Sequence, residues 1–274
     1  MTSRSPRLAA VLATVAAVGL VACGALPMHH APDAVSRQAG FVPRDVVVDG
    51  RVHRYQVFVP GSAPGAKPPV ILFLHGSGER GDDGIKPTLA GLGPHVRSNA
   101  ETFPAIVVFP QVPEGGEWQG TSVDVAFAAL DAATAEFDGD RDRTYLTGMS
   151  MGGYGTWELA LAQPGRFAAL VPVCGAVRQP DDERALFVTP VAGDPDPYAS
   201  IARTLRDVPV WIFHGAKDNV VLPDDDRGLI AAFRAVGAGD AHYTEFPDAN
   251  HNAWDPAYTQ TPDLWRWLFS RTRR

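Results

Sequence analysis

The sequence of 274 residues contains only two cysteines, Cys23 and Cys174. Cys174 lies at the end of an apolar run over residues 168–174, which is typical of a buried strand. The chain therefore has no disulfide framework, even if it works in an oxidising compartment. Packing of a hydrophobic core must hold the fold together, and the chain is long enough to bury one.

Positive charge is also scarce. The chain carries 24 lysines and arginines against 31 aspartates and glutamates, which gives a formal net charge of −7. Removal of residues 1–22, which contain two arginines and no acidic residue, would change the charge from −7 to −9. A basic groove is absent, and this argues against nucleic acid as a partner.

The sequence shows no internal repeat and no apolar run long enough to span a bilayer. Residues 8–22 are apolar but too short, and the basic residues Arg4 and Arg7 precede them, as in a bacterial export signal. The signal ends Leu-Val-Ala-Cys at residues 20–23, which resembles the bacterial lipobox. The resemblance implies that Cys23 is lipidated and places the protein on the periplasmic or outer face of a membrane. The alternative is an ordinary signal peptide in which Cys23 is incidental.

We predict three segments along the chain: a lipoprotein signal peptide over residues 1–22, a tether over residues 23–44, and a single catalytic domain over residues 45–274. The neighbouring His29 and His30 lack further ligands, so we read them as part of a solvated tail. Residues 138–142 resemble half a calcium loop but lack its glycine and distal glutamate. No metal and no cofactor are predicted.

The domain begins with a β-hairpin pattern, in which Asp49 and Gly50 form a turn between residues 46–48 and 55–59. Afterwards apolar strand patterns alternate with helical patterns. The predicted strands cover residues 70–74, 105–109, 144–147, 168–173, 210–213 and 242–246, and the clearest predicted helices cover residues 123–137, 154–162 and 229–236. This alternation predicts an α/β fold with a mostly parallel sheet and helices on both faces.

The most informative motif is Gly-Met-Ser-Met-Gly at residues 148–152. It follows a predicted strand and precedes a predicted helix, so the chain must turn sharply at Ser150. Such a turn favours glycine on both sides and presents the serine hydroxyl at the N-terminus of the helix. Ser150 is therefore the predicted nucleophile.

Three polar residues follow the carboxyl ends of three predicted strands, where ligand-facing loops of a parallel sheet lie. They are Ser150, Asp218 and His251, in an order that resembles the α/β-hydrolase superfamily over residues 45–274. In this scheme His251 is the general base, and Asp218 orients its imidazole. The rival bases are His75 and His214, and the rival acids are Asp224, Asp225, Asp226, Asp248 and Asp255.

The oxyanion of such an enzyme needs backbone N–H donors. We expect one from Met151 and the other from Ser77, with Gly76 and Gly78 as alternatives. The loop over residues 75–81 also spells Gly-x-Gly-x-x-Gly, a dinucleotide-binding pattern. No helix follows it directly and no acid ends the next strand, so an oxidoreductase fits this sequence poorly.

Residues 74–81, 150–157 and 251–258 resemble compact secreted esterases and predicted peptidases near the dienelactone hydrolases and feruloyl esterases. The chain departs from prolyl oligopeptidases in lacking a propeller, and from dienelactone hydrolases in having Ser150 where they have cysteine. The resemblance implies a serine carboxylesterase that acts on a small-molecule or cell-wall ester. A serine peptidase and a non-catalytic binding lipoprotein are the alternatives.

The segment between two predicted strands, residues 175–209, is short for a lid. We therefore expect an open cleft. Trp118 and Trp254 are predicted to form its walls, because aromatic side chains suit an acyl or aromatic group of a substrate.

Overall fold

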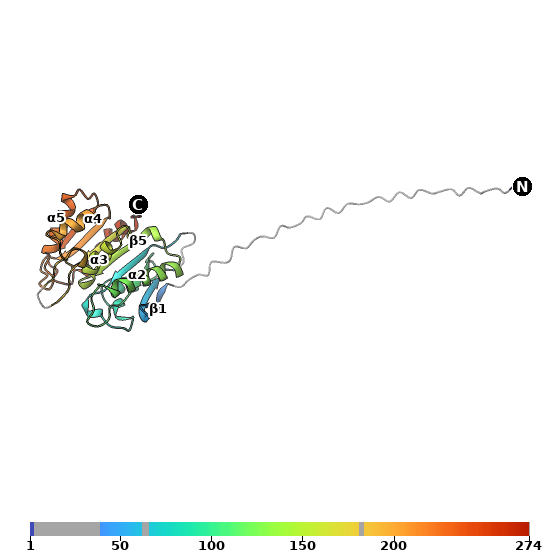
Figure 1. Ribbon diagram of the computed structural model, residues 1–274, viewed down its shortest axis with the longest axis horizontal. Helices are drawn as coiled ribbons and strands as arrows, with labels where there is room; N and C mark the ends of the chain where they lie inside the picture. Colours follow the sequence, from blue (N-terminus) through green and yellow to red (C-terminus); the bar gives the residue numbers. More distant parts are fainter. Residues whose placement is uncertain (3–38, 62–65, 181–183, 274) are drawn as a thin grey trace. The chain divides into compact units, whose positions relative to one another are not determined.

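The computed structural model describes residues 1–2, 39–61, 66–180 and 184–273 (Figure 1). The predicted export signal beyond its first two residues, Cys23 and the two neighbouring histidines lie outside these ranges. Contacts group the described residues from Ala39 onward into one compact unit. Within the described ranges, no helix combines the length and apolar character that a membrane crossing requires.

An eight-stranded sheet forms the centre of this unit, with the strand order β1-β2-β4-β3-β5-β6-β7-β8. The first two strands are antiparallel to their neighbours, and all later neighbours are parallel. This arrangement confirms the predicted α/β-hydrolase architecture. The strands are β1 (Gly40–Val48), β2 (Arg51–Val59), β3 (Val70–Leu74), β4 (Ile106–Phe109), β5 (Thr144–Met149), β6 (Ala169–Val173), β7 (Val210–Gly215) and β8 (Ala241–Phe246).

The N-terminal hairpin forms at the predicted turn, where Asp49 and Gly50 both adopt positive φ angles of 50° and 72°. The predicted end of the tether at residue 44 is wrong, because β1 already begins at Gly40. Phe41 anchors this earlier start, since its ring lies 5.4 Å from that of Phe58. Pro43 is tolerated because β1 lies at the edge of the sheet.

Helices cover both faces of the sheet. Residues of α2, α3 and α5 share one hydrophobic cluster with one face, and residues of α1, α6 and α7 share another with the opposite face. The sequence predicted α2, α3 and α5, but not the shorter helices. The helices are α1 (Leu92–Ser98), α2 (Thr121–Glu136), α3 (Met151–Ala162), α4 (Pro197–Thr204), α5 (Asp224–Ala235), α6 (Trp254–Thr259) and α7 (Pro262–Phe269), with short 3₁₀ turns η1 (Ser77–Glu79), η2 (Lys86–Thr88), η3 (Arg141–Arg143) and η4 (Thr189–Val191).

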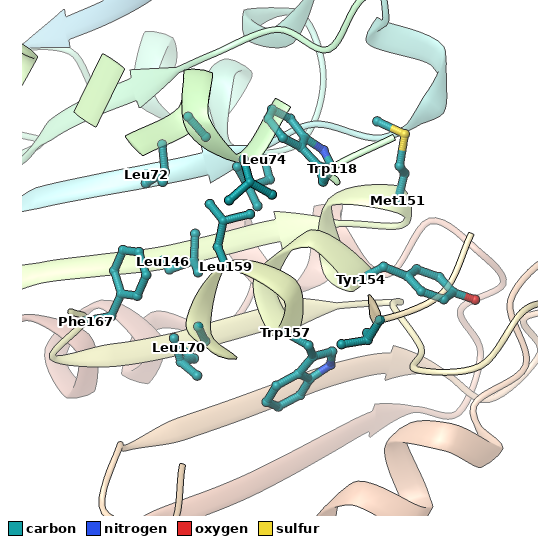
Figure 2. Packing of buried hydrophobic residues seen from close by; sticks show 14 of the residues in the cluster. Leu72, Leu74, Trp118, Leu146, Met151, Tyr154, Trp157, Leu159, Phe167 and Leu170 are labelled. Atoms are coloured by element: carbon teal, nitrogen blue, oxygen red, sulfur yellow. The ribbon is translucent and has the colours of Figure 1, made fainter. Parts of the chain in front are cut away.

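Helix α3 is pressed against the sheet and so fixes the position of its own N-terminus. Figure 2 shows Leu159 of this helix directed toward Leu146 of β5. The approach is closest at Gly152, where a Cβ atom would lie 1.9 Å from the carbonyl oxygen of Leu74. At Gly148 a Cβ atom would lie 2.2 Å from the carbonyl oxygen of Gly152. The two glycines of the motif are therefore required by close backbone packing.

Candidate active site

Ser150 occupies the sharp turn between β5 and α3. Its backbone lies at φ 54° and ψ −119°, in a region that L-residues rarely adopt. Such a conformation costs on the order of 1–3 kcal/mol and persists only where the surroundings impose it. The Ser150 amide donates to the carbonyl of Val173 at 2.9 Å, which ties the turn to β6. Ser150 is half-buried at this turn, at the start of α3.

The three residues predicted from their strand ends come together in space. Ser150 Oγ lies 2.9 Å from His251 Nε2, and His251 Nδ1 lies 2.7 Å from Asp218 Oδ2. Asp218 follows β7, and His251 follows β8. Because the Asp218 carboxylate accepts the Nδ1–H, Nε2 is left to accept the Ser150 hydroxyl proton. The arrangement can transfer a proton from the serine as its oxygen attacks a carbonyl.

The Asp218 carboxylate has donors for both of its oxygens. Oδ1 accepts from the amides of Val220 and Val221 at 2.9 and 3.0 Å, while Oδ2 faces His251 and His214. Burial alone would raise the pKa of Asp218, but the hydrogen bonds from these four donors outweigh it and lower the pKa well below its usual range. Asp218 is therefore an anion at neutral pH although its side chain is fully buried.

Two segments next to Ser150 can supply N–H donors for an oxyanion. Met151 is the first residue of α3, where amides have no partner within the helix. The loop after β3 approaches so closely that a Cβ atom on Gly76 would lie 3.5 Å from Cβ of Ser150. Ser77 follows in this loop and begins η1. Both predicted donors are thus in segments that border the serine.

The structure adds a polar network beside Ser77 that the sequence did not predict. The Ser77 hydroxyl accepts from Arg184 Nη2 at 2.6 Å, and Arg184 also pairs with Glu117 at 3.0 Å. Glu117 in turn pairs with Arg80 at 2.7 Å. The network joins the loop after β3 to the segment between β6 and β7. No sequence signal identified it, because its members lie far apart in the chain.

Residues 115–270 match the prolyl oligopeptidase family, a family of peptidases. The match covers more than half of the chain and contains Ser150, Asp218 and His251. The chain belongs to the prolyl oligopeptidase family. The predicted resemblance to hydrolases of this neighbourhood is thereby confirmed.

Curated relatives of this family member are esterases by name. It is 29% identical over 168 residues to the putative esterase NocK of Nocardia uniformis subsp. tsuyamanensis, covering 56% of this chain and 48% of that one. It is 26% identical over 184 residues to the bifunctional acetylxylan esterase/xylanase XynS20E of Neocallimastix patriciarum, covering 65% and 23%. The chain therefore spans about half or less of the length of these relatives.

A solved structure described as a thermostable esterase has a similar fold. It superposes with a TM-score of 0.70 at 28% identity, covering 85% of this chain and 63% of that one. Here too the chain matches only part of its counterpart. The likeness supports the α/β-hydrolase architecture that the strand order already shows.

The two predicted wall residues have different surroundings in this family member. Trp118 is 2% exposed, packs against Gly155, and donates its Nε1–H to the carbonyl of His75 at 3.0 Å. The prediction that Trp118 lines an open cleft is wrong, because its indole belongs to the core. Trp254 is half-buried, and its ring lies 5.6 Å from that of His251 in an edge-to-face arrangement. Trp254 therefore remains a candidate contact for substrate.

Most rivals for the base and the acid are engaged elsewhere. Both ring nitrogens of His75 are within hydrogen-bond distance of backbone atoms, and burial lowers its pKa to about 4. Asp248 pairs with Lys217 on the surface, and Asp255 accepts from Asn252. None of these contacts involves Ser150.

The three rival acids at the start of α5 have different surroundings in the structure. Asp224 pairs with Arg227, while Asp225 accepts from backbone amides at residues 177 and 178. Asp226 is fully buried and contacts His214. The buried pair was missed. Among the described residues, no group of three potential ligands is arranged to bind a metal ion.

Proposed function

We propose that the protein is a serine hydrolase that cleaves carboxylic esters through an acyl-enzyme intermediate. The observation that carries the proposal is the hydrogen-bonded chain from Ser150 through His251 to the buried anion Asp218. The strained turn at Ser150 supports it, because strain of this kind is typical of nucleophiles in this fold. A non-catalytic binding protein would have no need of these hydrogen bonds between Ser150, His251 and Asp218.

In the first half-reaction, the Ser150 oxygen attacks the ester carbonyl while His251 Nε2 takes the hydroxyl proton. Asp218 stabilises the imidazolium that forms. The amides of Met151 and Ser77 donate to the oxyanion of the tetrahedral intermediate, and one such donor contributes roughly 3 kcal/mol. His251 then protonates the departing alkoxide, which leaves as an alcohol.

In the second half-reaction, water attacks the acyl group on Ser150. His251 takes a proton from this water and returns it to the serine oxygen as the acid departs. The enzyme is restored, and the ester has become an acid and an alcohol. No cofactor is needed for either step.

We favour esters over amides for two reasons. The relatives described above bear esterase names, and the short segment between β6 and β7 offers little to hold a peptide. An alkoxide leaves readily, whereas an amide nitrogen must be protonated in an accurately held complex. The family assignment favours a peptidase as the second candidate, since the family is named for peptidases.

Covalent labelling tests the nucleophile. A fluorophosphonate probe should add one adduct to the wild-type protein and none to Ser150→Ala, as read by intact-protein mass spectrometry. An unlabelled wild type, or an adduct that persists in the variant, would contradict the assignment and favour the non-catalytic alternative.

Matched substrates separate the two candidate reactions. An ester and an amide that share one acyl group should differ in kcat/KM by far more than tenfold in favour of the ester. If the amide is cleaved within about tenfold of the ester, a difference of roughly 1.4 kcal/mol in barrier, the peptidase assignment is correct instead.

Export and anchoring through Cys23 are part of the same proposal. Wild-type protein expressed in a bacterial host should partition into detergent, and Cys23→Ser should not. Identical partitioning and N-terminal mass for the two proteins would refute lipidation. A single acyl chain binds only marginally, so stable anchoring requires several.

A further inference from the structure

A second histidine contacts the Asp218 carboxylate from within the core. His214 Nε2 lies 3.2 Å from Asp218 Oδ2, the oxygen that His251 also contacts, and 2.9 Å from the carbonyl oxygen of Val221. His214 Nδ1 lies 2.7 Å from Asp226 Oδ2. The contacts thus continue past Asp218, from the serine hydroxyl to a carboxyl group on α5.

The neighbours of His214 determine where one of its protons lies. The Val221 carbonyl oxygen can only accept a hydrogen bond, so His214 Nε2 must carry hydrogen and can donate to Asp218 as well. The contact between Nδ1 and Asp226 then holds one further proton. His214 and Asp226 together carry no net charge, whichever atom that proton occupies.

Both side chains of this pair are fully buried. Burial lowers the pKa of His214, but Asp218 and Asp226 outweigh it and raise the pKa to about 10. Burial raises the pKa of Asp226. The charged groups that face His214 are these two carboxylates and, from β8, Glu245. A buried pair of this kind is costly unless its members satisfy each other. Asp226 Oδ2 meets His214 Nδ1, whereas Asp226 Oδ1 is buried and has no hydrogen-bond partner among the described residues.

We propose that His214 and Asp226 are positioning residues of the active site, which hold Asp218 Oδ2 in the orientation that His251 requires. The inference rests on the proposed serine hydrolase function. The amides of Val220 and Val221 fix Oδ1, and His214 fixes Oδ2. Rotation of the carboxylate away from His251 would break these contacts together.

The pair also moderates the charge that His251 faces. A donor on the far side of Asp218 draws part of the carboxylate's negative charge toward itself. The imidazolium formed during attack is therefore stabilised less strongly than beside an isolated carboxylate, which helps it to return its proton to the leaving group.

The test compares Asp226→Asn, His214→Leu and His214→Gln with wild type. Asp226→Asn preserves shape and is expected to fold. In His214→Leu and Asp226→Asn we expect kcat to fall by about 10- to 100-fold, as expected for a weakened hydrogen bond to a charged group, while KM changes by less than about twofold. His214→Gln retains a donor and should recover at least part of the loss. Rates are divided by the concentration of sites titrated with a fluorophosphonate.

The pH profile supplies a readout that a merely structural role would not change. In His214→Leu, Asp218 loses its second partner and attracts the proton of His251 more strongly, so the acid limb of kcat/KM should move to higher pH. Asp225→Asn is the matched control, since it lies on the same helix, loses hydrogen bonds to backbone amides and contacts neither histidine. Its acid limb should stay in place.

The outcomes are distinct. Folded Asp226→Asn and His214→Leu with wild-type kcat and an unmoved acid limb would overturn the inference, and so would equal losses in Asp225→Asn. A wild type without Ser150-dependent labelling or hydrolysis would instead overturn the proposed function, and the inference with it.

Discussion

His75 and His214 occupy equivalent positions in two parts of the molecule. Each stands at the carboxyl end of a parallel strand, is followed by glycine, and is fully buried. The rings differ in their partners. The ring nitrogens of His75 face backbone atoms, and its pKa is lowered to about 4. His214 lies between two carboxylates, and its pKa is raised to about 10.

The difference shows that burial does not by itself decide the charge of a histidine. Desolvation acts on both rings in the same direction, against the cation. Two buried carboxylates reverse the result for His214. The same local pattern can therefore place a histidine whose pKa is lowered beside backbone atoms, or one whose pKa is raised between two carboxylates.

The largest effect is expected at His251, and it shows whether His75 or His214 can act as the base in its place. We expect His251→Ala to lower kcat by roughly 10⁶-fold, because the members of such a triad act as one unit. The measurement is steady-state hydrolysis of a p-nitrophenyl ester at pH 8. Residual activity above about 1% of wild type would mean that His75 or His214 can replace His251.

A smaller effect, on stability, should follow from removing the contacts between His75 and backbone atoms. In His75→Leu the buried amide of Val112 loses its acceptor, and the free energy of unfolding should fall by about 1–3 kcal/mol. Urea unfolding at pH 7 measures it. His75→Gln keeps an acceptor within reach and is the matched control. Equal losses in the two variants would show that packing, and not the hydrogen bond, explains the effect.

The two histidines should also give opposite slopes of stability against pH. His75 is harder to protonate when folded, so its contribution is lost as pH falls from 6.5 toward 4. His214 binds its proton more tightly when folded, so its contribution is present below 6.5 and lost as pH rises toward 10. Each slope is at most about 1.4 kcal/mol per pH unit. The difference in melting temperature between wild type and His75→Gln or His214→Gln, measured across this pH range, isolates the contribution of each histidine. Slopes of the same sign for the two histidines would contradict the comparison.

The smallest effect is expected at Asp248, an exposed rival for the catalytic acid that pairs with Lys217. Surface ion pairs contribute little, so Asp248→Asn should change kcat/KM by less than about twofold and Tm by less than about 1 °C. A loss of activity comparable to that of Asp218→Asn would identify Asp248 as a catalytic acid.

Much of this architecture could be predicted because its signals are local. Strand and helix periodicity, the Asp49–Gly50 turn and the glycines around Ser150 each depend on neighbouring residues. Strand ends also meet at one edge of a parallel sheet, so placing Ser150, Asp218 and His251 after three strands was enough to bring them together.

What could not be predicted depends on side-chain direction across long separations. Trp118 turned inward because Gly155 leaves room for its indole. In the sequence Asp226 looks like its neighbours Asp224 and Asp225, which are exposed and half-buried. Only the rotation of α5 directs it to His214. Helix α4 did carry a local signal, since Asp196 caps it and Pro197 begins it. No helix was predicted there.

The closeness of Gly152 to the backbone of β3 limits how this protein can diversify. Even a methyl group at Gly152 would collide with the Leu74 carbonyl, so this position in the turn that carries Ser150 does not tolerate substitution. New substrate preferences must arise where the chain is not packed backbone to backbone, such as the segment between β6 and β7. Laboratory evolution of this protein toward new substrates should accordingly enrich changes in that segment and return the glycines of the turn unaltered.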